Sequence, residues 1–233
     1  MTNYKRIAIK ISGEALGTES DSFNINFIHE LVNNIIKLVD KYEIIIIVGG
    51  GNFFRGKENK KLNIHQAKAD QMGMLATIMN GIFLKEIFEQ YNQNVSLLSN
   101  INCSCICETF NIDYANKLLK EKYILICVGG ISVPYFTTDT AVTLKACELK
   151  CDLIMKATKV NGIYSKDPTI YNDAVFYDTI SFEEVMKNNI EVMDKAAFEM
   201  ANKNNIPIIV FSIHNNILDI LENKIQHTKV TNN

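Results

Sequence analysis

The residues best suited to chemistry are three cations, each next to an apolar run. Lys10 lies inside "RIAIKIS", Lys156 inside "DLIMKATK", and Arg55 follows "IIIIVGGGNFF". An ammonium group in an apolar strand is costly to bury unless an anion accompanies it, and the planar guanidinium of arginine matches phosphate oxygens. These cations therefore predict a phosphate-bearing ligand. The alternatives are that Lys10 reaches solvent from an edge strand or pairs with Glu14, and that Arg55 forms a surface salt bridge.

Glycines end three of the apolar runs, and bare backbone lets an anion approach closely and meet N–H groups. Plain tight turns also use glycine. Neither Gly-x-x-x-x-Gly-Lys-Ser/Thr nor Gly-x-Gly-x-x-Gly follows a strand, so the phosphate site must be assembled from several loops. The glycines are Gly13 after "IAIKIS", Gly49, Gly50 and Gly51 after "IIIIV", and Gly129 and Gly130 after "ILICV".

Three aspartates are candidates to complete the site. Asp139, in "PYFTTDTA", follows Thr137 and Thr138 at the start of an amphipathic helix, where free N–H groups attract anions. It is either a helix cap, a ligand of Mg²⁺ or a residue that orients the lysines. Asp70 is expected to open another long helix, as a cap or as an acceptor for ribose hydroxyls. Asp167 precedes a proline and is expected in a turn.

The composition limits the function classes. The 233 residues are 47% hydrophobic, enough for a substantial core, and the formal charge of −2 gives no electrostatic footprint for nucleic acid. No apolar run reaches the roughly 18 residues of a membrane span, and the N-terminal run is too short for a secretory signal. We expect a cytoplasmic protein with no nucleic-acid or membrane partner. Its six cysteines are expected to be reduced thiols rather than metal ligands.

The elements that must position these residues alternate between strands and helices. Near-continuous apolar runs occur at 6–12, 43–51, 94–99, 123–130, 151–157 and 206–213, and they indicate parallel strands covered on both faces. Helical spacing of apolar residues occurs at 28–39 and 70–88. The alternation predicts an α/β fold, a three-layer αβα sandwich around a mainly parallel central sheet. Ligands of such sheets bind at the carboxyl ends of the strands.

Six segments together resemble the bacterial uridylate (UMP) kinases of the amino acid kinase superfamily, in order and in spacing. The resemblance runs from about Tyr4 to about Ser212. It implies one domain over 1–233, with a UMP-binding part at about 1–150 and an ATP-binding part at about 151–233. The segments are "YKRIAIKISGEALG", "VGGGNFFRG", "ADQMGMLATIMNG", "PYFTTDTA", "KATKVNGIYSKDP" and "VMDKAAFEMA".

The resemblance implies transfer of the γ-phosphoryl group of ATP to UMP, giving UDP and ADP for pyrimidine nucleotide biosynthesis, with Mg²⁺ accompanying ATP. The catalytic residues it implies are Lys10, Arg55, Asp139 and Lys156. Those it places at ATP are Lys10, Ile11, Ser12, Gly13, Gly51, Arg55, Thr158, Tyr164 and Asp167. Those it places at UMP are Gly50, Asp70, Ile131, Ser132, Val133, Pro134, Tyr135, Phe136, Thr137 and Thr138. Because the acceptor oxygen is ionised at neutral pH, no general base is assigned.

The sequence departs from the family pattern at the UMP loop. Gly130-Ile131-Ser132-Val133-Pro134 replaces the usual Gly-Thr-Gly-Asn-Pro, which removes a threonine hydroxyl and an asparagine amide. Asn161 replaces an aspartate near the ATP loop, and Gln66 stands where relatives often carry arginine. The loop change is expected to bear on UMP affinity, whereas Asn161 keeps the turn geometry and should have a mild effect. Effector control in the region of Gln66 stays an open property.

Partners and rival functions also follow from the resemblance. It implies a homohexamer built from dimers, with GTP activation and UTP inhibition as open properties. A superfamily kinase acting on acetylglutamate or carbamate is the nearest rival, but "ADQMGMLATIMNG" with "PYFTTDTA" resembles a UMP site. A nucleotide-sensing hexamer with weak or no kinase activity is the alternative from another class. The intact set of Lys10, Arg55 and Asp139 argues against it.

Overall fold

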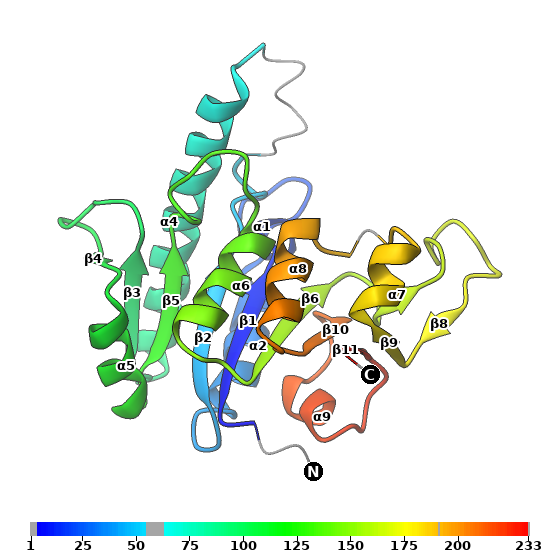
Figure 1. The fold of residues 1–233 in the computed structure, drawn as a ribbon. Coiled ribbons are helices and arrows are strands. Elements are labelled where there is room, and N and C mark those ends of the chain that lie inside the picture. Colours follow the sequence, from blue (N-terminus) through cyan, green and yellow to red (C-terminus); the bar gives the residue numbers. More distant parts are fainter. Residues whose placement is uncertain (1–3, 55–62, 191, 233) are drawn as a thin grey trace.

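The computed structural model describes residues 4–54, 63–190 and 192–232. Within these ranges nine strands form one sheet, in the order β4-β3-β5-β2-β1-β6-β10-β11-β9 (Figure 1). All neighbouring pairs in it are parallel except β10 and β11. The strands are β1 (Arg6–Ile11), β2 (Glu43–Val48), β3 (Val95–Ser99), β4 (Glu108–Thr109), β5 (Ile124–Val128), β6 (Leu153–Thr158), β9 (Thr179–Ser181), β10 (Ile208–Ser212) and β11 (Thr228–Thr231).

Helices cover both faces of the sheet, which explains why the central strands are apolar along their whole length. Alternate side chains of β1 enter opposite layers: Ile7, Ile9 and Ile11 pack in one, and Ala8 in the other. The first layer holds α2 (Ile25–Ile36), α4 (Gln66–Gln90) and α9 (Ile217–Leu221). The second holds α5 (Ile112–Lys120), α6 (Thr138–Glu148), α7 (Phe182–Lys187) and α8 (Lys195–Lys203). The predicted αβα sandwich is confirmed.

Two small elements extend from the carboxyl ends of the strands. The short helix α1 (Gly13–Leu16) directly follows β1. An antiparallel ribbon of β7 (Ile163–Tyr164) and β8 (Phe176–Tyr177) follows β6. None of the helices in the described ranges is long and apolar enough to cross a bilayer.

The start of α4 differs from the sequence-based expectation. Asp70 does not open this helix; the helix begins at Gln66, after His65. The ring nitrogen Nδ1 of His65 accepts the backbone N–H of Ala67, so His65 takes the capping role. Asp70 lies four residues inside α4, where its Oδ1 accepts the side-chain amide of Gln66 at 2.8 Å and its Oδ2 makes a contact beyond the helix.

Candidate active site

Lys10 and Lys156 lie side by side at the carboxyl ends of two neighbouring strands. The parallel register of β1 and β6 pairs them directly, so both side chains project from the same face of the sheet. Both are buried, with exposed fractions of 8% and 7%. Two adjacent buried ammonium groups repel each other and need a counter-charge.

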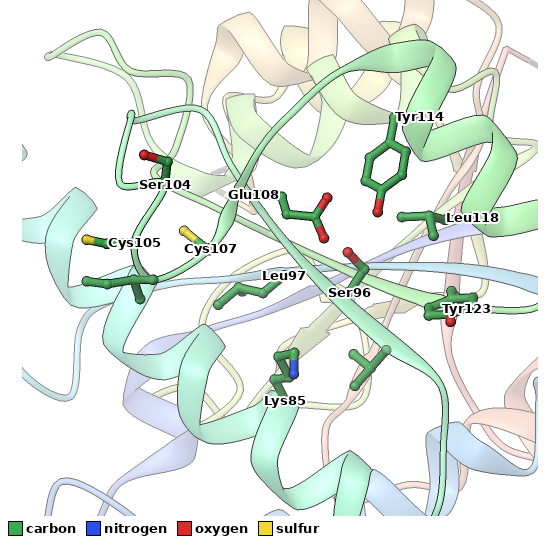
Figure 2. Close-up of a pocket in the computed structure, with 12 residues that line it drawn as sticks. Lys85, Ser96, Leu97, Ser104, Cys105, Cys107, Glu108, Tyr114, Leu118 and Tyr123 are labelled. Carbon is green, nitrogen blue, oxygen red and sulfur yellow. The ribbon is translucent and has the colours of Figure 1, made fainter.

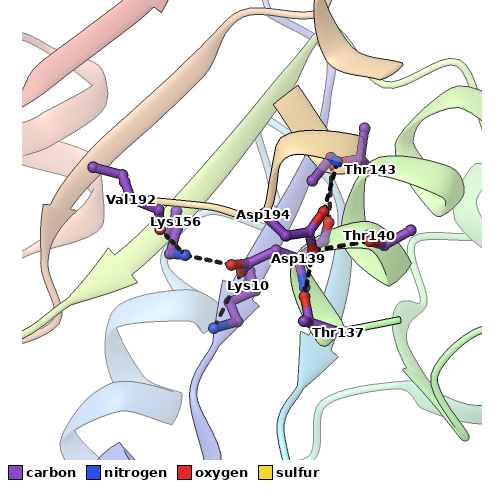
Figure 3. A network of polar contacts seen from close by, with 9 residues as sticks. Lys10, Thr137, Asp139, Thr140, Thr143, Lys156, Val192 and Asp194 are labelled. Carbon is purple, nitrogen blue, oxygen red and sulfur yellow. Dashed lines mark hydrogen bonds and ion pairs between the residues drawn. The ribbon is translucent and has the colours of Figure 1, made fainter. Parts of the chain in front are cut away.

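Asp139, from the first turn of α6, supplies that counter-charge (Figure 3). Its Oδ2 accepts a hydrogen bond from Nζ of Lys156 at 2.6 Å, and its Oδ1 lies 3.3 Å from Nζ of Lys10. Thr137, not Asp139, caps the helix, because its hydroxyl accepts the Asp139 N–H. Of the roles considered for Asp139, the geometry therefore supports orientation of the lysines.

Burial and the neighbouring charges shift the pKa values of Asp139 and Lys156. Burial alone would raise the pKa of Asp139, but the ammonium groups of Lys10 and Lys156 outweigh it and hold that pKa below its ordinary value. Burial lowers the pKa of Lys156, and Asp139 only partly opposes this. With Asp139 ionised and both lysines protonated, the trio carries a net positive charge. Such a centre attracts phosphate.

The segment 192–194 holds Lys156 and the first turn of α6 in place, a role that was not predicted from the sequence. Nζ of Lys156 donates to the carbonyl oxygen of Val192. Asp194 Oδ2 accepts the hydroxyls of Thr137 and Thr140, the latter at 2.9 Å, while its Oδ1 caps α8 through the N–H of Ala197 at 2.8 Å (Figure 3). Asp194 thereby ties α6 to α8. The Thr137 hydroxyl donates to this carboxylate, so it is already engaged.

A cavity of about 270 Å³ opens beside the N-terminus of α6. It gathers six residues predicted to bind UMP, together with Gly51, which was predicted to bind ATP. The remaining lining comes from Phe54, Ala69, Gly73, Met74, Thr77 and Gly130. The six are Gly50, Asp70, Ile131, Phe136, Thr137 and Thr138.

The loop after β5 forms one wall of this cavity and is held at several points. The carboxylate of Asp70 accepts the N–H of Tyr135 at 2.8 Å, and the Ser132 hydroxyl donates to the carbonyl of Asn100 at 2.7 Å. Gly129, Gly130, Ser132 and Tyr135 all have positive φ. Ser132, Val133, Pro134 and Tyr135 belong to this loop but do not line the cavity. Tyr135 and Val133 are largely exposed.

The residues predicted to bind ATP lie on a different set of strand ends. Ile11, Ser12 and Gly13 form the β1–α1 junction, where a Cβ on Gly13 would lie 2.7 Å from the carbonyl oxygen of Gly49. This contact explains the glycine, because the loops after β1 and β2 touch through backbone. Thr158 ends β6.

Tyr164 and Asp167 belong to the ribbon that follows β6. Tyr164 packs edge-on against Phe176, at 5.1 Å between ring centres. Asp167 forms the predicted turn, since its carboxylate accepts both the N–H and the hydroxyl of Thr169. Those hydrogen bonds lower the pKa of Asp167. Arg55 lies outside the described residues.

The donor set does not fit a magnesium ion held by the protein. Within the described ranges, no three or more histidine, cysteine, aspartate or glutamate side chains gather as metal ligands. The carboxylate of Asp139 is already paired with two ammonium groups, whose positive charges would repel a divalent cation. We therefore assign no step to a metal bound at Asp139.

A larger hollow of about 410 Å³ lies at the β3–β4 edge of the sheet (Figure 2). Its lining includes Glu108, Tyr114, Tyr123 and Cys107, and its amino group, Lys85, is paired with Glu89 at 2.5 Å. Burial raises the pKa of Cys107 to about 11, so its thiol stays protonated at neutral pH. This hollow lacks the convergent glycines and cations of the Lys10 centre and is a poor candidate for the phosphate site.

Comparisons with known proteins agree with the fold. The model of the Amino acid kinase family matches residues 5–212. A uridylate kinase of Haemophilus ducreyi is 40% identical over 212 residues, covering 90% of each chain. One of Mycoplasmopsis pulmonis is 42% identical over 236 residues, covering 98% of this chain and 97% of its own.

A solved structure has the same fold as this chain. The crystal structure of UMP kinase from Ureaplasma parvum superposes with a TM-score of 0.94 at 36% identity, and the match covers 98% of this chain and 99% of that one. The fold, the converging lysines and the sequence matches point the same way. The chain belongs to the amino acid kinase family.

Proposed function

We propose that the protein is a UMP kinase, which transfers the γ-phosphoryl group of ATP to UMP and releases UDP and ADP. The observation that carries the proposal is the Lys10–Asp139–Lys156 centre. Its Asp139 directly follows Thr138, which lines a cavity with five other residues predicted to bind UMP. The uridylate kinase relatives, near 40% identity over most of the chain, support this choice of acceptor. The reaction supplies UDP for pyrimidine nucleotide biosynthesis.

The transfer needs charge neutralisation and alignment rather than a side-chain nucleophile. An oxygen of the UMP phosphate forms a bond to the γ-phosphorus while the bond from that phosphorus to the β–γ bridging oxygen breaks. Lys10 and Lys156 stabilise the negative charge on the transferred group. Asp139 fixes their positions, since it contacts both ammonium groups. No proton is removed by a base, because the acceptor oxygen is already ionised.

The acceptor is positioned by the cavity beside α6. The first backbone N–H groups of an 11-residue helix lie beside that cavity, together with Thr138. Asp70 is placed to accept a ribose hydroxyl, in exchange for or beside the Tyr135 N–H that it holds here. Ile131 lines the cavity through an apolar side chain and therefore contributes contact rather than a hydrogen-bond donor.

The donor nucleotide and its metal contact both parts of the chain in this proposal. ATP binds across Ser12, Gly13, Gly51 and the β6–β7 segment, with residues from about 151 contributing the adenosine contacts and residues to about 150 the UMP contacts. Mg²⁺ arrives on the ATP phosphates, as is usual where substrate oxygens supply most ligands.

Assembly into a homohexamer is part of the proposal. One face of α4 exposes Met72, Leu75, Met79 and Ile82, each at least 42% accessible. These spacings form a continuous apolar stripe on the helix, and such a stripe marks an interaction surface. A second copy of the chain at this stripe would form the dimer from which the hexamer is built.

Effector control and location complete the proposal. GTP activation and UTP inhibition rest on the family resemblance alone, and turnover measured with each nucleotide added tests them. A cytoplasmic location suits an enzyme whose two substrates are nucleotides.

The test is an ADP-release assay with ATP and Mg²⁺, offering UMP, CMP, dUMP, acetylglutamate and carbamate in parallel. Turnover that requires UMP, or is far fastest with it, is the expected result. Turnover with acetylglutamate or carbamate instead would assign another kinase activity. Binding of nucleotides without turnover of any acceptor would favour the sensor alternative.

A further inference from the structure

Two buried threonines, far apart in sequence, make the same pair of hydrogen bonds at the two nucleotide sites. Thr77, on α4, is 3% exposed, and Thr228, on β11, is fully buried. Each hydroxyl accepts a backbone N–H from a loop and donates to a backbone carbonyl. We infer that Thr77 positions the UMP loop and Thr228 positions the ATP ribbon, a division of roles that rests on the proposed function.

Thr77 connects α4 to the end of β5. Its hydroxyl donates to the carbonyl of Met74 at 2.6 Å and accepts the N–H of Gly129 at 2.8 Å. Gly129 has a φ of +77°, and the loop that starts there carries Ile131 and Phe136 into the cavity. Because the Thr77 hydroxyl holds the N–H of Gly129, it sets where this loop leaves the strand, and Thr77 itself lines the same cavity.

The same face of α4 fixes the opposite wall of the cavity. Asn80 is fully buried and donates to the carbonyl of Gly49 at 2.6 Å, while Gly50 packs against Ala76. Asp70 holds the N–H of Tyr135. One rigid helix therefore sets the separation of the glycine loops after β2 and β5, and Thr77 is its contact with the second loop.

Thr228 makes the equivalent connection at the ATP side. Its hydroxyl donates to the carbonyl of Tyr177 at 2.5 Å and accepts the N–H of Ile163 at 2.7 Å. Ile163 precedes Tyr164 on the ribbon. Thr228 also packs so closely on Gly162 that no side chain fits there. The hydroxyl thus holds both strands of the ribbon, β7 and β8, to the main sheet.

The experiment compares Thr77→Val with Thr228→Val, which keep the side-chain shape and remove only the hydroxyl. Calorimetric dissociation constants are measured for UMP and for a non-hydrolysable ATP analogue. We expect Thr77→Val to weaken UMP binding about tenfold with ATP-analogue binding within about twofold, and Thr228→Val to do the reverse. A factor of about ten corresponds to about 1.4 kcal/mol, which lies within the range for the two buried hydrogen bonds that each variant loses.

Two further variants keep the test decisive. Thr77→Ser retains the hydroxyl and should restore UMP affinity. Ser96→Ala removes a buried hydroxyl that has no hydrogen-bond partner among the described residues, and it should leave both constants unchanged. Faster amide exchange at Gly129 in Thr77→Val, and at Ile163 in Thr228→Val, is the expected direct signature.

The outcomes separate this inference from the proposed function. Equal weakening of both ligands by each valine variant, or no weakening by either, would overturn the assignment of roles. Wild-type protein that binds both nucleotides but does not phosphorylate UMP would overturn the proposed function. The roles of Thr77 and Thr228 would then still be decided by the dissociation constants of the two valine variants.

Discussion

At the residue scale, the central feature is one carboxylate shared by two buried ammonium groups. Replacing Asp139 by asparagine leaves the charges of Lys10 and Lys156 buried together without compensation. Breaking a buried pair in this way costs about 3–5 kcal/mol. We expect Asp139→Asn to lower the free energy of unfolding by about that amount near neutral pH, measured by urea denaturation. Asp173→Asn, in an exposed pair with Lys166, should cost under about 1 kcal/mol.

The lowered pKa of Asp139 predicts how this difference depends on pH. Because the folded-state pKa lies below the ordinary value of 3.8, the carboxylate stabilises the fold fully above that value. The contribution is lost as pH falls through the folded-state pKa. The stability gap between wild type and Asp139→Asn should be constant from about pH 5 to 7 and shrink in stronger acid. A gap that widens on acidification would contradict this assignment of charge.

Asp194 is predicted to act through the residues it holds. Removing its carboxylate in Asp194→Ala takes away the α8 cap and the partner of Thr137 and Thr140. We expect a loss of about 1–3 kcal/mol in unfolding free energy. Because α6 carries Asp139, kcat should also fall roughly ten- to hundredfold through misplacement. Wild-type kcat in a measurably destabilised variant would reduce Asp194 to a helix cap.

At this scale the charged trio could be predicted from the sequence, but the residues that hold it and the neighbouring loop in place, Asp194 and Thr77, could not. Lys10, Lys156 and Asp139 were predicted because apolar strand ends and a helix start converge in an α/β fold, and the structure brings them into contact. Asp194 shows only a capping pattern before a helix, and its contact with Thr137 arises from tertiary packing. The hydroxyl of Thr77 inside a helix gives no local signal at all. The nucleotide contacts of these residues stay predictions.

At the element scale, α4 does two things: it packs against the glycine loop after β2, and it forms one wall of the cavity. Gly73 lies on its cavity side, and a Cβ there would meet no atom within 4 Å. A Cβ on Gly50, in contrast, would lie 2.7 Å from both Ala76 and the Gly73 carbonyl. The two glycines are therefore needed for different reasons, one for open space and the other for a close contact. Gly73 leaves the cavity open at this wall, and Gly50 allows the loop to touch the helix.

Alanine substitutions at Gly73 and Gly50 should have different effects on stability and on UMP affinity. Gly73→Ala should raise the unfolding free energy by about 0.5–1 kcal/mol through helix propensity, while weakening UMP binding because the methyl group narrows the cavity. Gly50→Ala should lower stability and UMP affinity together. Urea unfolding and UMP calorimetry check both. Unchanged UMP affinity in Gly73→Ala would place the acceptor away from this wall.

The boundaries of elements were predicted less well than their existence. The expected strands and helices all form, but α4 starts at Gln66 rather than at Asp70, because His65 caps it. A histidine cap is uncommon, whereas aspartate is a frequent one, so local propensity pointed to the wrong residue. As a consequence Asp70 has no capping role, and its carboxylate accepts the N–H of Tyr135 in the loop after β5.

At the scale of the whole molecule, the fold and the family followed from the sequence because its apolar runs, glycines and motifs agree with one another. The mainly parallel sheet and its covering layers are confirmed, as is membership of the amino acid kinase family. Assembly did not follow from composition. The apolar stripe on α4 emerges only when burial is known, since its residues resemble core positions in the sequence.

The stripe gives a prediction for the assembled protein. A double variant, Leu75→Glu and Met79→Glu, places charges where a second copy is expected to pack. Light scattering should show a mass below that of a hexamer of 26.4 kDa chains, with unchanged circular dichroism. Ile170→Glu, on the ribbon connection and 70% exposed, is the matched control and should keep the wild-type mass. An intact hexamer in the double variant would exclude the stripe as an interface.

The measurement that tests the central claim most directly is the turnover of Lys10→Ala with ATP, Mg²⁺ and UMP. If Lys10 stabilises charge that develops during transfer, kcat should fall by orders of magnitude while the KM for UMP changes little. Turnover equal to wild type would remove Lys10 from the mechanism and contradict the account of the site.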